Sequence, residues 1–493
     1  MSRFFTLTLV AVLLCLGRAT QGQGHDAHWI FGNGFHLEFN DDGPTILPRI
    51  EDYFSLEGGS CISDPEGNLL YYSNVVNIWN RNFEPLSNSD TLGIGDPPYS
   101  TKSSGSLFLP WPGDTADRYV GFLAMNDLNH KLYLSKIDRF LDSGLGGIID
   151  TFRYIEVWEE PIGEQLNAVR HGNGRDWWIV ARKRTLPASN EFIIALLTPD
   201  GVSYWQSQGS GYFGNEHGTL TFSRNGDRMA AATSKGLCPT SPSSVALYSF
   251  NRCDGQFNLI DTLPTRECSP NAYGVAFSPD GNRIYYSTVE RTNLYQASLI
   301  DGKLVDTLVF SPGGGIALSG GNLLGGSNGK IYVNYMRLLP SVYDTFGMFL
   351  GVINSPNFFG PSCQFDTFGL YLGGEFNTGL SLPNFANYDL GPLVGSPCDT
   401  LSPQDTTQTG IFHQPTPRED WSVFPTTSSG LYTLQSDQAG WLMVHDLYGR
   451  EVLRQWHEQT TPFDLTAQPA GLYLVHLRAA DGKQSLPQKI IRQ

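Results

Sequence analysis

A degenerate repeat of two short strands, joined by a tight turn that contains glycine, limits the possible folds of this chain more than anything else in its sequence. Its clearest copy is residues 274–287, where apolar runs flank the pair Asp280-Gly281. Asp-Gly between apolar runs predicts a β-hairpin, because glycine adopts a positive φ at little cost. Five weaker copies follow the same plan: residues 61–73, 106–123, 166–180, 220–230 and 323–333.

The spacing of these turns predicts how the hairpins assemble. The turn glycines are Gly67, Gly113, Gly174, Gly226, Gly281 and Gly329, with spacings of 46, 61, 52, 55 and 48 residues. A period near 50 residues is the size of one four-stranded propeller blade. Residues 28–394 then hold close to seven such units, which predicts an all-β fold with a seven-bladed β-propeller over residues 28–400. Six or eight blades, or a series of β-sandwiches, are the alternatives, and the period disfavours sandwiches. We expect a strand at residues 29–39 to close the ring beside the last blade, because closure removes an unpaired strand edge.

Aromatic residues make up 12% of the chain, and many fall within the predicted strands. Flat rings on a pleated surface fill the space between packed sheets. We therefore expect these side chains to be buried between blades, and a platform for stacking carbohydrate is the alternative. The residues concerned are Tyr71, Tyr72, Trp177, Trp178, Tyr285 and Tyr286.

The beginning of the chain has the pattern of a secretory signal peptide. A short basic start precedes an apolar run over residues 4–16, and small residues suited to cleavage follow by residue 22. The run is too short for a transmembrane helix, and we expect no transmembrane segment elsewhere. The net charge is −16 and becomes −18 once Arg3 and Arg18 are removed with the signal. An acidic chain without a basic stripe repels phosphate backbones, so nucleic-acid binding is not expected.

Six cysteines remain after residues 1–22 are removed, and an even number in an exported chain is compatible with disulfides. The spacing predicts Cys238–Cys253 across one hairpin and Cys363–Cys398, with buried free thiols as the alternative. The absence of a CxxC pair or a neighbouring histidine cluster argues against a zinc site.

The composition changes near residue 401. Residues 401–420 are polar and rich in Thr, Gln and Pro, which is typical of a linker. Residues 421–493 then show short alternating strands, which predict a small β-sandwich. The expected strands are residues 431–434, 441–446, 451–456, 471–477 and 489–491.

Several motifs in the tail resemble the type A C-terminal sorting domain of the type IX secretion system of Bacteroidota. The matching pieces are residues 423–425, 444–452, 463–466, 470–475 and 488–491. The usual opening of that family, Pro-Asn-Pro, is here Pro425-Thr426-Thr427. The resemblance implies Sec-dependent export to the periplasm, recognition of the tail by the type IX machinery, and release from or attachment to the outer cell surface.

The body is similar to WD40-like β-propeller proteins of the same bacteria. The supporting stretches are residues 29–39, 274–287 and 379–393. This resemblance implies a fold and a compartment, and it implies no reaction.

A search for catalytic motifs yields one weak match. Residues 325–329 read Gly-Gly-Ser-Asn-Gly, the letters of a nucleophile elbow. An elbow needs a strand-to-helix turn to lift its serine, whereas this match lies in a predicted hairpin. We therefore expect no catalytic residue there.

Two groups of polar side chains are weaker candidates for chemistry. His171 and His217, with Glu216 or Asp176, could ring a central funnel and hold a metal or relay protons. Scattered loop histidines are the alternative that we favour, since no ligand spacing supports a site. The acidic residues at 41–42 and 64–66 could coordinate calcium, but ordinary turn chemistry explains them better.

These observations predict a secreted or cell-surface binding protein without a cofactor or metal. A polysaccharide or a surface protein is the expected partner, because propellers present broad rigid faces with variable loops. We expect the chain not to be an enzyme. The alternative is a secreted hydrolase or lyase acting on glycans or peptides in the propeller funnel, which converging carboxylates in that funnel would favour.

Overall fold

The chain divides into two compact units, Met1–Thr406 and Thr407–Gln493. The structure, a computed structural model, describes residues 24–40, 43–89, 102–126, 128–185, 189–214, 217–233, 244–264, 272–289, 293–312, 318–337, 346–374, 378–400, 421–436, 439–446, 450–479 and 488–493. The predicted signal peptide and linker lie outside these residues. None of the helices in the described part of the chain is long and apolar enough to span a membrane.

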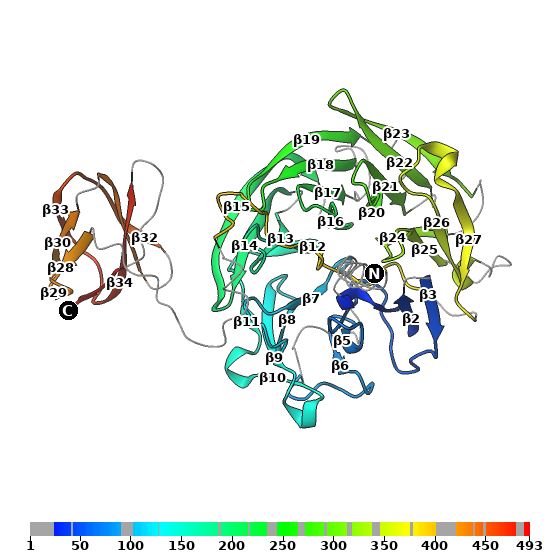
Figure 1. The fold of residues 1–493 in the computed structure, drawn as a ribbon, viewed down its shortest axis with the longest axis horizontal. Helices are drawn as coiled ribbons and strands as arrows, with labels where there is room; N and C mark the ends of the chain where they lie inside the picture. The colour runs from blue at the N-terminus through cyan, green and yellow to red at the C-terminus, as the bar shows by residue number, and fades with distance from the viewer. Residues whose placement is uncertain are drawn as a thin grey trace, which may run out of the picture. The chain divides into compact units, whose positions relative to one another are not determined.

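The described part of the first unit is built from antiparallel sheets that follow one another along the chain (Figure 1). Sheet 1 holds β1 (His28–Phe31), β2 (Phe35–Asn40) and β3 (Gly43–Leu47), and sheet 2 holds β4 (Ser60–Ser63), β5 (Leu69–Ser73) and β6 (Ile78–Asn80). Sheet 3 holds β7 (Ser106–Pro110), β8 (Tyr119–Met125), β9 (Leu132–Asp138), β10 (Gly147–Ile148) and β11 (Ile155–Glu156). Sheet 4 holds β12 (Ile162–Arg170), β13 (Trp177–Lys183), β14 (Ser189–Thr198) and β15 (Gly201–Gly214).

The remaining three sheets of this unit each have four strands in chain order. Sheet 5 holds β16 (Leu220–Phe222), β17 (Arg228–Thr233), β18 (Ser244–Phe250) and β19 (Phe257–Pro264). Sheet 6 holds β20 (Ala272–Phe277), β21 (Arg283–Thr288), β22 (Leu294–Ile300) and β23 (Lys303–Phe310). Sheet 7 holds β24 (Leu318–Gly325), β25 (Ile331–Arg337), β26 (Phe349–Ile353) and β27 (Phe365–Tyr371). Short 3-10 helices lie at η1 (Gly24–Asp26), η2 (Asp142–Gly144), η3 (Asp150–Phe152), η4 (Phe346–Met348) and η5 (Gly360–Cys363).

The sheets form a ring because each packs its apolar side chains against the next. Separate buried clusters join sheets 1 and 2, 2 and 3, 3 and 4, 4 and 5, 5 and 6, and 6 and 7. A further cluster joins sheet 7 back to sheet 1, where Trp29 and Phe39 pack on Tyr332. In sheets 3 to 7 the first strand, β7, β12, β16, β20 or β24, lies nearest the middle of the ring in Figure 1. The unit therefore has the circular arrangement of a β-propeller, as the repeat predicted.

The six predicted turn glycines all adopt a positive φ, between 70° and 91°. Each connects the first two strands of a sheet, so the strand–turn–strand assignment of the six repeat copies is confirmed. The predicted single strand at residues 29–39 is wrong. These residues form the hairpin β1–β2 and add β3 to make a sheet of their own. The cause is the sequence Gly32-Asn33-Gly34, because both glycines adopt a positive φ and a Cβ on Gly34 would lie 1.9 Å from the Ile50 carbonyl oxygen.

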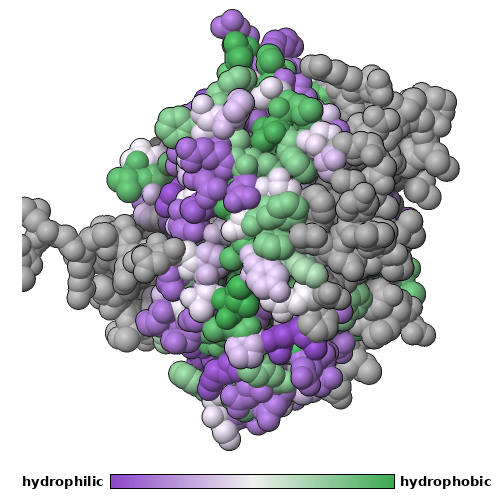
Figure 2. All heavy atoms as spheres, turned by 90° about the vertical axis from the view of Figure 1, so that its right-hand side faces the viewer, coloured by the Kyte–Doolittle hydropathy of each residue, from purple (hydrophilic) through white to green (hydrophobic). Residues whose placement is uncertain are grey.

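The aromatic side chains singled out from the sequence are buried between sheets, with exposed fractions of 5% or less. Other rings lie on the outside of the ring. On the outermost strand of sheet 7, Phe368 and Tyr371 are exposed and both contact Phe349. Figure 2 shows hydrophobic side chains gathered in a band on the side of the unit that faces right in Figure 1, where β27 lies. The prediction that aromatic side chains pack between blades is therefore confirmed for Tyr71, Tyr72, Trp177, Trp178, Tyr285 and Tyr286.

The second unit contains two sheets that share one core in its described part. One sheet has the order β28 (Trp421–Phe424), β30 (Leu431–Ser436), β33 (Thr460–Asp464). The other has the order β29 (Thr427–Ser428), β35 (Gln488–Arg492), β34 (Gly471–Ala479), β31 (Gly440–Asp446), β32 (Glu451–His457). Leu434 of the first sheet and Val444 and Val475 of the second are fully buried in the common cluster. All five strands expected from the sequence are present, and β28, β29 and β33 are additional.

Candidate functional site

The ring has two ends that differ in chemistry. We call the end where the chain enters each first strand the entry face, and the end that carries the six glycine turns the turn face. Polar residues stand at the entry face in the segments before β4, β7 and β16 and at the start of β12. These side chains form the candidate site.

Glu164, near the start of β12, is the centre of this polar cluster and is 5% exposed. Its carboxylate accepts hydrogen bonds from the hydroxyl of Ser103 at 2.7 Å and from the backbone N–H of Ser103 at 3.3 Å. The Nδ1 atom of His217 lies 2.8 Å away, and the ammonium of Lys102 lies 3.9 Å away. Burial alone would raise the pKa of Glu164, but these partners hold it below its ordinary value. Glu164 is therefore a stable carboxylate.

Glu57 is a second carboxyl group beside Glu164, and it is 8% exposed. Burial, followed by the negative charge of Glu164, raises the pKa of Glu57 to about 8. A hydrogen bond to Tyr273 opposes that shift. At neutral pH the cluster thus holds one protonated and one ionised carboxyl group, which is the pairing that acid–base chemistry uses.

Positive side chains line one flank of the cluster. The ring of His130 lies 3.3 Å from the Lys102 ammonium and 3.4 Å from the Arg184 guanidinium. Burial and these two charges lower the pKa of His130 to about 4. His130 is therefore neutral at physiological pH, and Lys102 and Arg184 carry the charge of this flank. Of the cluster, His217 is the most open to solvent, with 46% of its side chain exposed.

Residues 378–398 form an extended segment that runs through the ring from one face to the other, which we call the axial segment. At the entry face, Leu380 donates its backbone N–H to Leu56, and its carbonyl accepts from Asn322. In the middle, Asn384 donates to the carbonyls of Ser106 and Leu166, both at 3.0 Å. These contacts reach the first strands or the segments before them in four sheets, so the axial segment takes up the channel at the centre.

The axial segment also completes the polar cluster. The hydroxyl of Ser381 donates to the Ser103 carbonyl at 3.2 Å and lies 3.4 Å from the Tyr273 hydroxyl. Residues 379–393, which carry part of the resemblance to WD40-like propeller proteins, therefore connect the centre of the ring to the candidate site.

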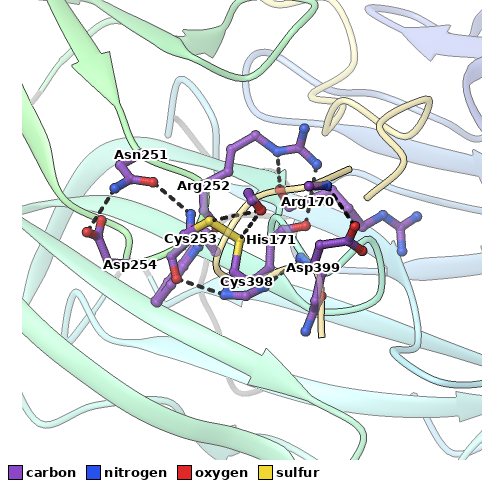
Figure 3. The surroundings of a disulfide bond; sticks show 12 residues. Arg170, His171, Asn251, Arg252, Cys253, Asp254, Cys398 and Asp399 are labelled. Carbon is purple, nitrogen blue, oxygen red and sulfur yellow. Dashed lines mark hydrogen bonds between the residues drawn. A yellow bond between two sulfur atoms is a disulfide. The ribbon is translucent and has the colours of Figure 1, made fainter. Parts of the chain in front are cut away.

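A disulfide holds the far end of the axial segment at the turn face (Figure 3). Cys253, in the turn between β18 and β19, is bonded to Cys398. Beside it, Arg252 donates to the carbonyls of Arg170 at 2.8 Å and Gly391 at 2.6 Å. Figure 3 shows Arg252 and His171 on either side of the sulfur atoms. The chain is thus fixed to sheet 5 where it leaves the ring.

Both disulfide pairings expected from the sequence are wrong. Cys253 pairs with Cys398 instead of Cys238, and Cys363 is a buried free thiol. Cys238 lies outside the described residues. Proximity in sequence favoured Cys253 with Cys238, but the axial segment carries Cys398 back across the ring to the turn that contains Cys253. Cys61 is also a buried free thiol, as the alternative interpretation allowed.

The hypothesis that His171 and His217 share one site is wrong. His217 pairs with Glu164 near the start of β12, whereas His171 follows the end of that strand. Seven residue steps along an extended strand separate Glu164 from His171, a distance of about 23 Å. The ring of His171 contacts the Cys253 carbonyl at 3.0 Å and accepts from the Asn173 N–H at 3.0 Å, so it stabilises a turn. Glu216 lies outside the described residues.

The remaining sequence candidates have structural roles. Asp176 pairs with Arg175 in the turn that follows β12. Asp64 accepts hydrogen bonds from the backbone N–H and side-chain amide of Asn68, which is turn chemistry. The Ser327 match lies between β24 and β25, two strands of one hairpin. Asp41 and Asp42 lie outside the described residues. Within the described ranges, no group of three or more His, Cys, Asp or Glu side chains is placed to hold a metal ion.

The cluster residues that sequence reasoning missed are Glu57, Lys102, Ser103, His130, Glu164, Arg184 and Tyr273. They belong to no motif, and only closure of the ring brings them together. One signal was present: Glu57, Lys102 and His217 each stand just before the first strand of a repeat copy. Aligning the repeats by their turn glycines would have placed these side chains at one face.

No family model and no curated protein matches this chain. Solved structures with some likeness include a functionally unknown protein from Desulfotomaculum acetoxidans, at 15% identity and a TM-score of 0.41, covering 72% of this chain and 99% of that one. A putative 6-phosphogluconolactonase from Bacteroides uniformis gives 13% identity and a TM-score of 0.39, covering 64% and 93%. The β-propeller domain of Cps50 (Swd1) from Myceliophteria thermophila gives 11% and 0.36, covering 62% and 92%. Likeness at this level assigns neither a family nor an activity.

Proposed function

We propose that this chain is a secreted or surface-attached binding protein of a Bacteroidota-type cell, with a seven-bladed β-propeller as its scaffold and a type IX sorting domain at its end. We infer the binding role from the axial segment. Its hydrogen bonds and the Cys253–Cys398 disulfide fill the central channel with the chain's own residues. A ring whose centre is filled can bind a partner on its broad faces. It leaves less room for a deep funnel in which a substrate could be converted.

The seven sheets in the described part of the first unit support a count of seven blades, one for each of the six repeat copies and one for the sheet β1–β3. Each sheet packs on two neighbours, and sheet 7 packs on sheet 1. The disulfide supports export, because disulfides persist in oxidising compartments.

The shared core of the two C-terminal sheets supports a β-sandwich at residues 421–493. The motif residues Asp446 and Arg450 close the end of the β31–β32 hairpin, where the guanidinium donates to the carboxylate at 2.7 Å. We propose that the type IX machinery recognises this unit after Sec-dependent export to the periplasm.

Deleting residues 421–493 tests the sorting proposal. The truncated protein should fold and remain in the periplasm, while the full chain reaches the surface or the medium. Fractionation with an antibody to the first unit provides the measurement. Surface display of the truncated protein at the level of the full chain would refute the sorting role.

A binding screen tests the scaffold proposal. The mature full-length chain is applied to arrays of polysaccharides and surface proteins, and turnover of each bound partner is followed in parallel. Saturable binding without product formation is the expected result. Product formation that depends on Glu164 would overturn it in favour of the second candidate.

The second candidate is a hydrolase acting at the entry face, and the Glu57–Glu164 pair is the observation that favours it. Glu57 would donate a proton to the leaving group, and Glu164 would act as the charged partner. Both carboxyl groups are buried, and Glu164 is bonded to Ser103 and His217. Because the Glu164 carboxylate already has these partners within the protein, we rank the hydrolase second. Loss of turnover in both Glu57→Gln and Glu164→Gln, with unfolding midpoints no lower than the parent's, would promote it.

A further inference from the structure

A hollow of about 450 Å³ lies at the turn face, away from the Glu57–Glu164 cluster. Sheets 5 and 6 supply most of its wall, and a residue just before η5 supplies the rest. The lining residues are Arg228, Asn282, Arg283, Ser298, Leu299, Ile300 and Phe359. Its volume is within the range of small-molecule sites.

The hollow is positively charged in an otherwise acidic protein. Arg228 and Arg283 line it, and no carboxylate does, although the chain carries a net charge of −16. Asp280, in the preceding turn, accepts hydrogen bonds from Ser278 and Asn282, and its negative charge interacts with the positive charge of Arg283. Two guanidinium groups against this one carboxylate leave the hollow with a net positive charge. Arg228 is held in place by the bond that its guanidinium donates to the Gly281 carbonyl at 3.2 Å. The local charge therefore favours an anion.

Two polar atoms of the lining are buried without a hydrogen-bond partner among the described residues. They are the Nε atom of Arg283 and the hydroxyl oxygen of Ser298. The two residues face each other in the register of β21 and β22. Leaving such groups unsatisfied is costly. Oxygen atoms of a bound ligand, with a small side-chain adjustment, would satisfy them.

Apart from Asn282, the rest of the lining is apolar. Phe359 is 53% exposed and Ile300 is 50% exposed. A guanidinium next to an exposed ring suits a ligand that carries an oxyanion on a cyclic body, because the fork of the guanidinium matches a carboxylate and the ring accepts an apolar face.

We propose that this hollow binds an acidic sugar unit of a polysaccharide through Arg283 and Arg228, with the sugar ring against Phe359. This inference rests on the proposed binding function and names the ligand class. A free inorganic anion also presents an oxyanion but has no sugar ring. Binding experiments can therefore distinguish an acidic sugar from an inorganic anion.

The test uses the mature full-length protein and isothermal titration with two probes. One is an oligogalacturonide of four units, and the other is the same oligosaccharide with its carboxylates methyl-esterified, which removes the charge and adds one methyl group to each unit. The acid form should bind at least about tenfold more tightly than the ester, since charged hydrogen bonds are roughly twice as strong as neutral ones. Inorganic sulfate should compete only weakly.

Three variants decide whether the hollow is responsible. Arg283→Met and Phe359→Ala should each weaken binding of the acid form by about tenfold or more. Exposed Arg81, outside the hollow, gives the matched control Arg81→Met, which should bind as the parent does. The Arg283 side chain forms no hydrogen bond or ion pair with described residues, so Arg283→Met should keep the parent's unfolding midpoint.

Several outcomes would overturn the inference. Equal binding of acid and ester, parent-like binding by Arg283→Met, or binding of sulfate without any sugar would each do so. Binding of neutral glycans that is insensitive to Arg283→Met would leave the proposed binding function standing and refute only the acidic-sugar site. Absence of binding to every glycan and surface protein would refute both.

Discussion

The side-chain amide of Asn384 donates to the carbonyls of Ser106 and Leu166, each at 3.0 Å, and so joins the axial segment to two innermost strands. Its carbonyl oxygen also accepts from Asn167 at 3.2 Å. Asn384 is 7% exposed, so these bonds have no competition from bulk water. One side chain thus connects sheets 3 and 4 through the middle of the ring.

Replacing Asn384 with alanine should lower the free energy of unfolding by about 2–4 kcal/mol, because three buried polar groups lose a partner. Urea unfolding followed by tryptophan fluorescence measures this. Asn258 is exposed on β19, and Asn258→Ala should change stability by less than about 0.5 kcal/mol. An equal effect of the two substitutions would mean that the axial segment does not brace the ring.

The Cys253–Cys398 disulfide encloses a loop with a sequence separation of 145 residues. Closing a loop of this length restricts the unfolded chain strongly, so the double variant Cys253→Ser/Cys398→Ser should lose about 4–5 kcal/mol in a chain-entropy account. Equilibrium unfolding without reductant compares it with the parent. Under reductant the two proteins should become nearly equal in stability. If the difference in stability persisted under reductant, the serine side chains would be its cause and not the missing disulfide.

The ring could be predicted from the sequence because each repeat copy that specifies it is local. A glycine turn and its two strands can be recognised from about 14 residues, and six copies at a near-constant period imply closure. Gly67 and Gly281 show this, since both have the positive φ that the turn requires. The hairpin at Gly32-Asn33-Gly34 carried the same signal but was absorbed into one predicted strand.

The candidate site could not be predicted in the same way, because its residues meet only after the ring closes. Glu57 and Glu164 are more than 100 positions apart, and nothing local marks either as buried. The disulfide failed for the same reason. Cys398 reaches Cys253 only because the axial segment crosses the ring, and no repeat copy contains that segment.

The stability of the protein should carry a pH signature from Glu57. Its pKa is about 8 in the folded protein against an ordinary value of 4.5, so between these pH values the folded state holds a proton that the unfolded state has lost. Stability from this group is therefore complete below about pH 4.5 and falls as the pH rises towards 8. Glu57→Gln keeps a neutral side chain and releases no proton.

The variant Glu57→Gln should consequently gain stability relative to the parent as the pH rises from 5 to 8, by a difference on the order of 2–4 kcal/mol, and the difference should level off above pH 8. Urea midpoints at half-unit pH steps provide the measurement. Exposed Glu66 gives a control, because Glu66→Gln should produce a curve parallel to the parent. If the Glu57→Gln curve is parallel as well, Glu57 is ionised in the folded protein and the paired-carboxyl description fails.

Alanine substitutions at two turn glycines can distinguish the cost of a left-handed backbone from the cost of a clash with the axial segment. Gly174 and Gly329 have nearly equal φ values, 77° and 75°. A Cβ on Gly174 would lie 2.7 Å from Pro392 of the axial segment, whereas a Cβ on Gly329 would meet nothing within 4 Å. Gly329→Ala should therefore cost only the left-handed conformation, about 1–2 kcal/mol. Gly174→Ala should cost that amount and a further 1–3 kcal/mol for the clash, measured by urea unfolding. Equal losses would indicate that residues near Pro392 move away freely, and the axial segment would then not be fixed at the turn face.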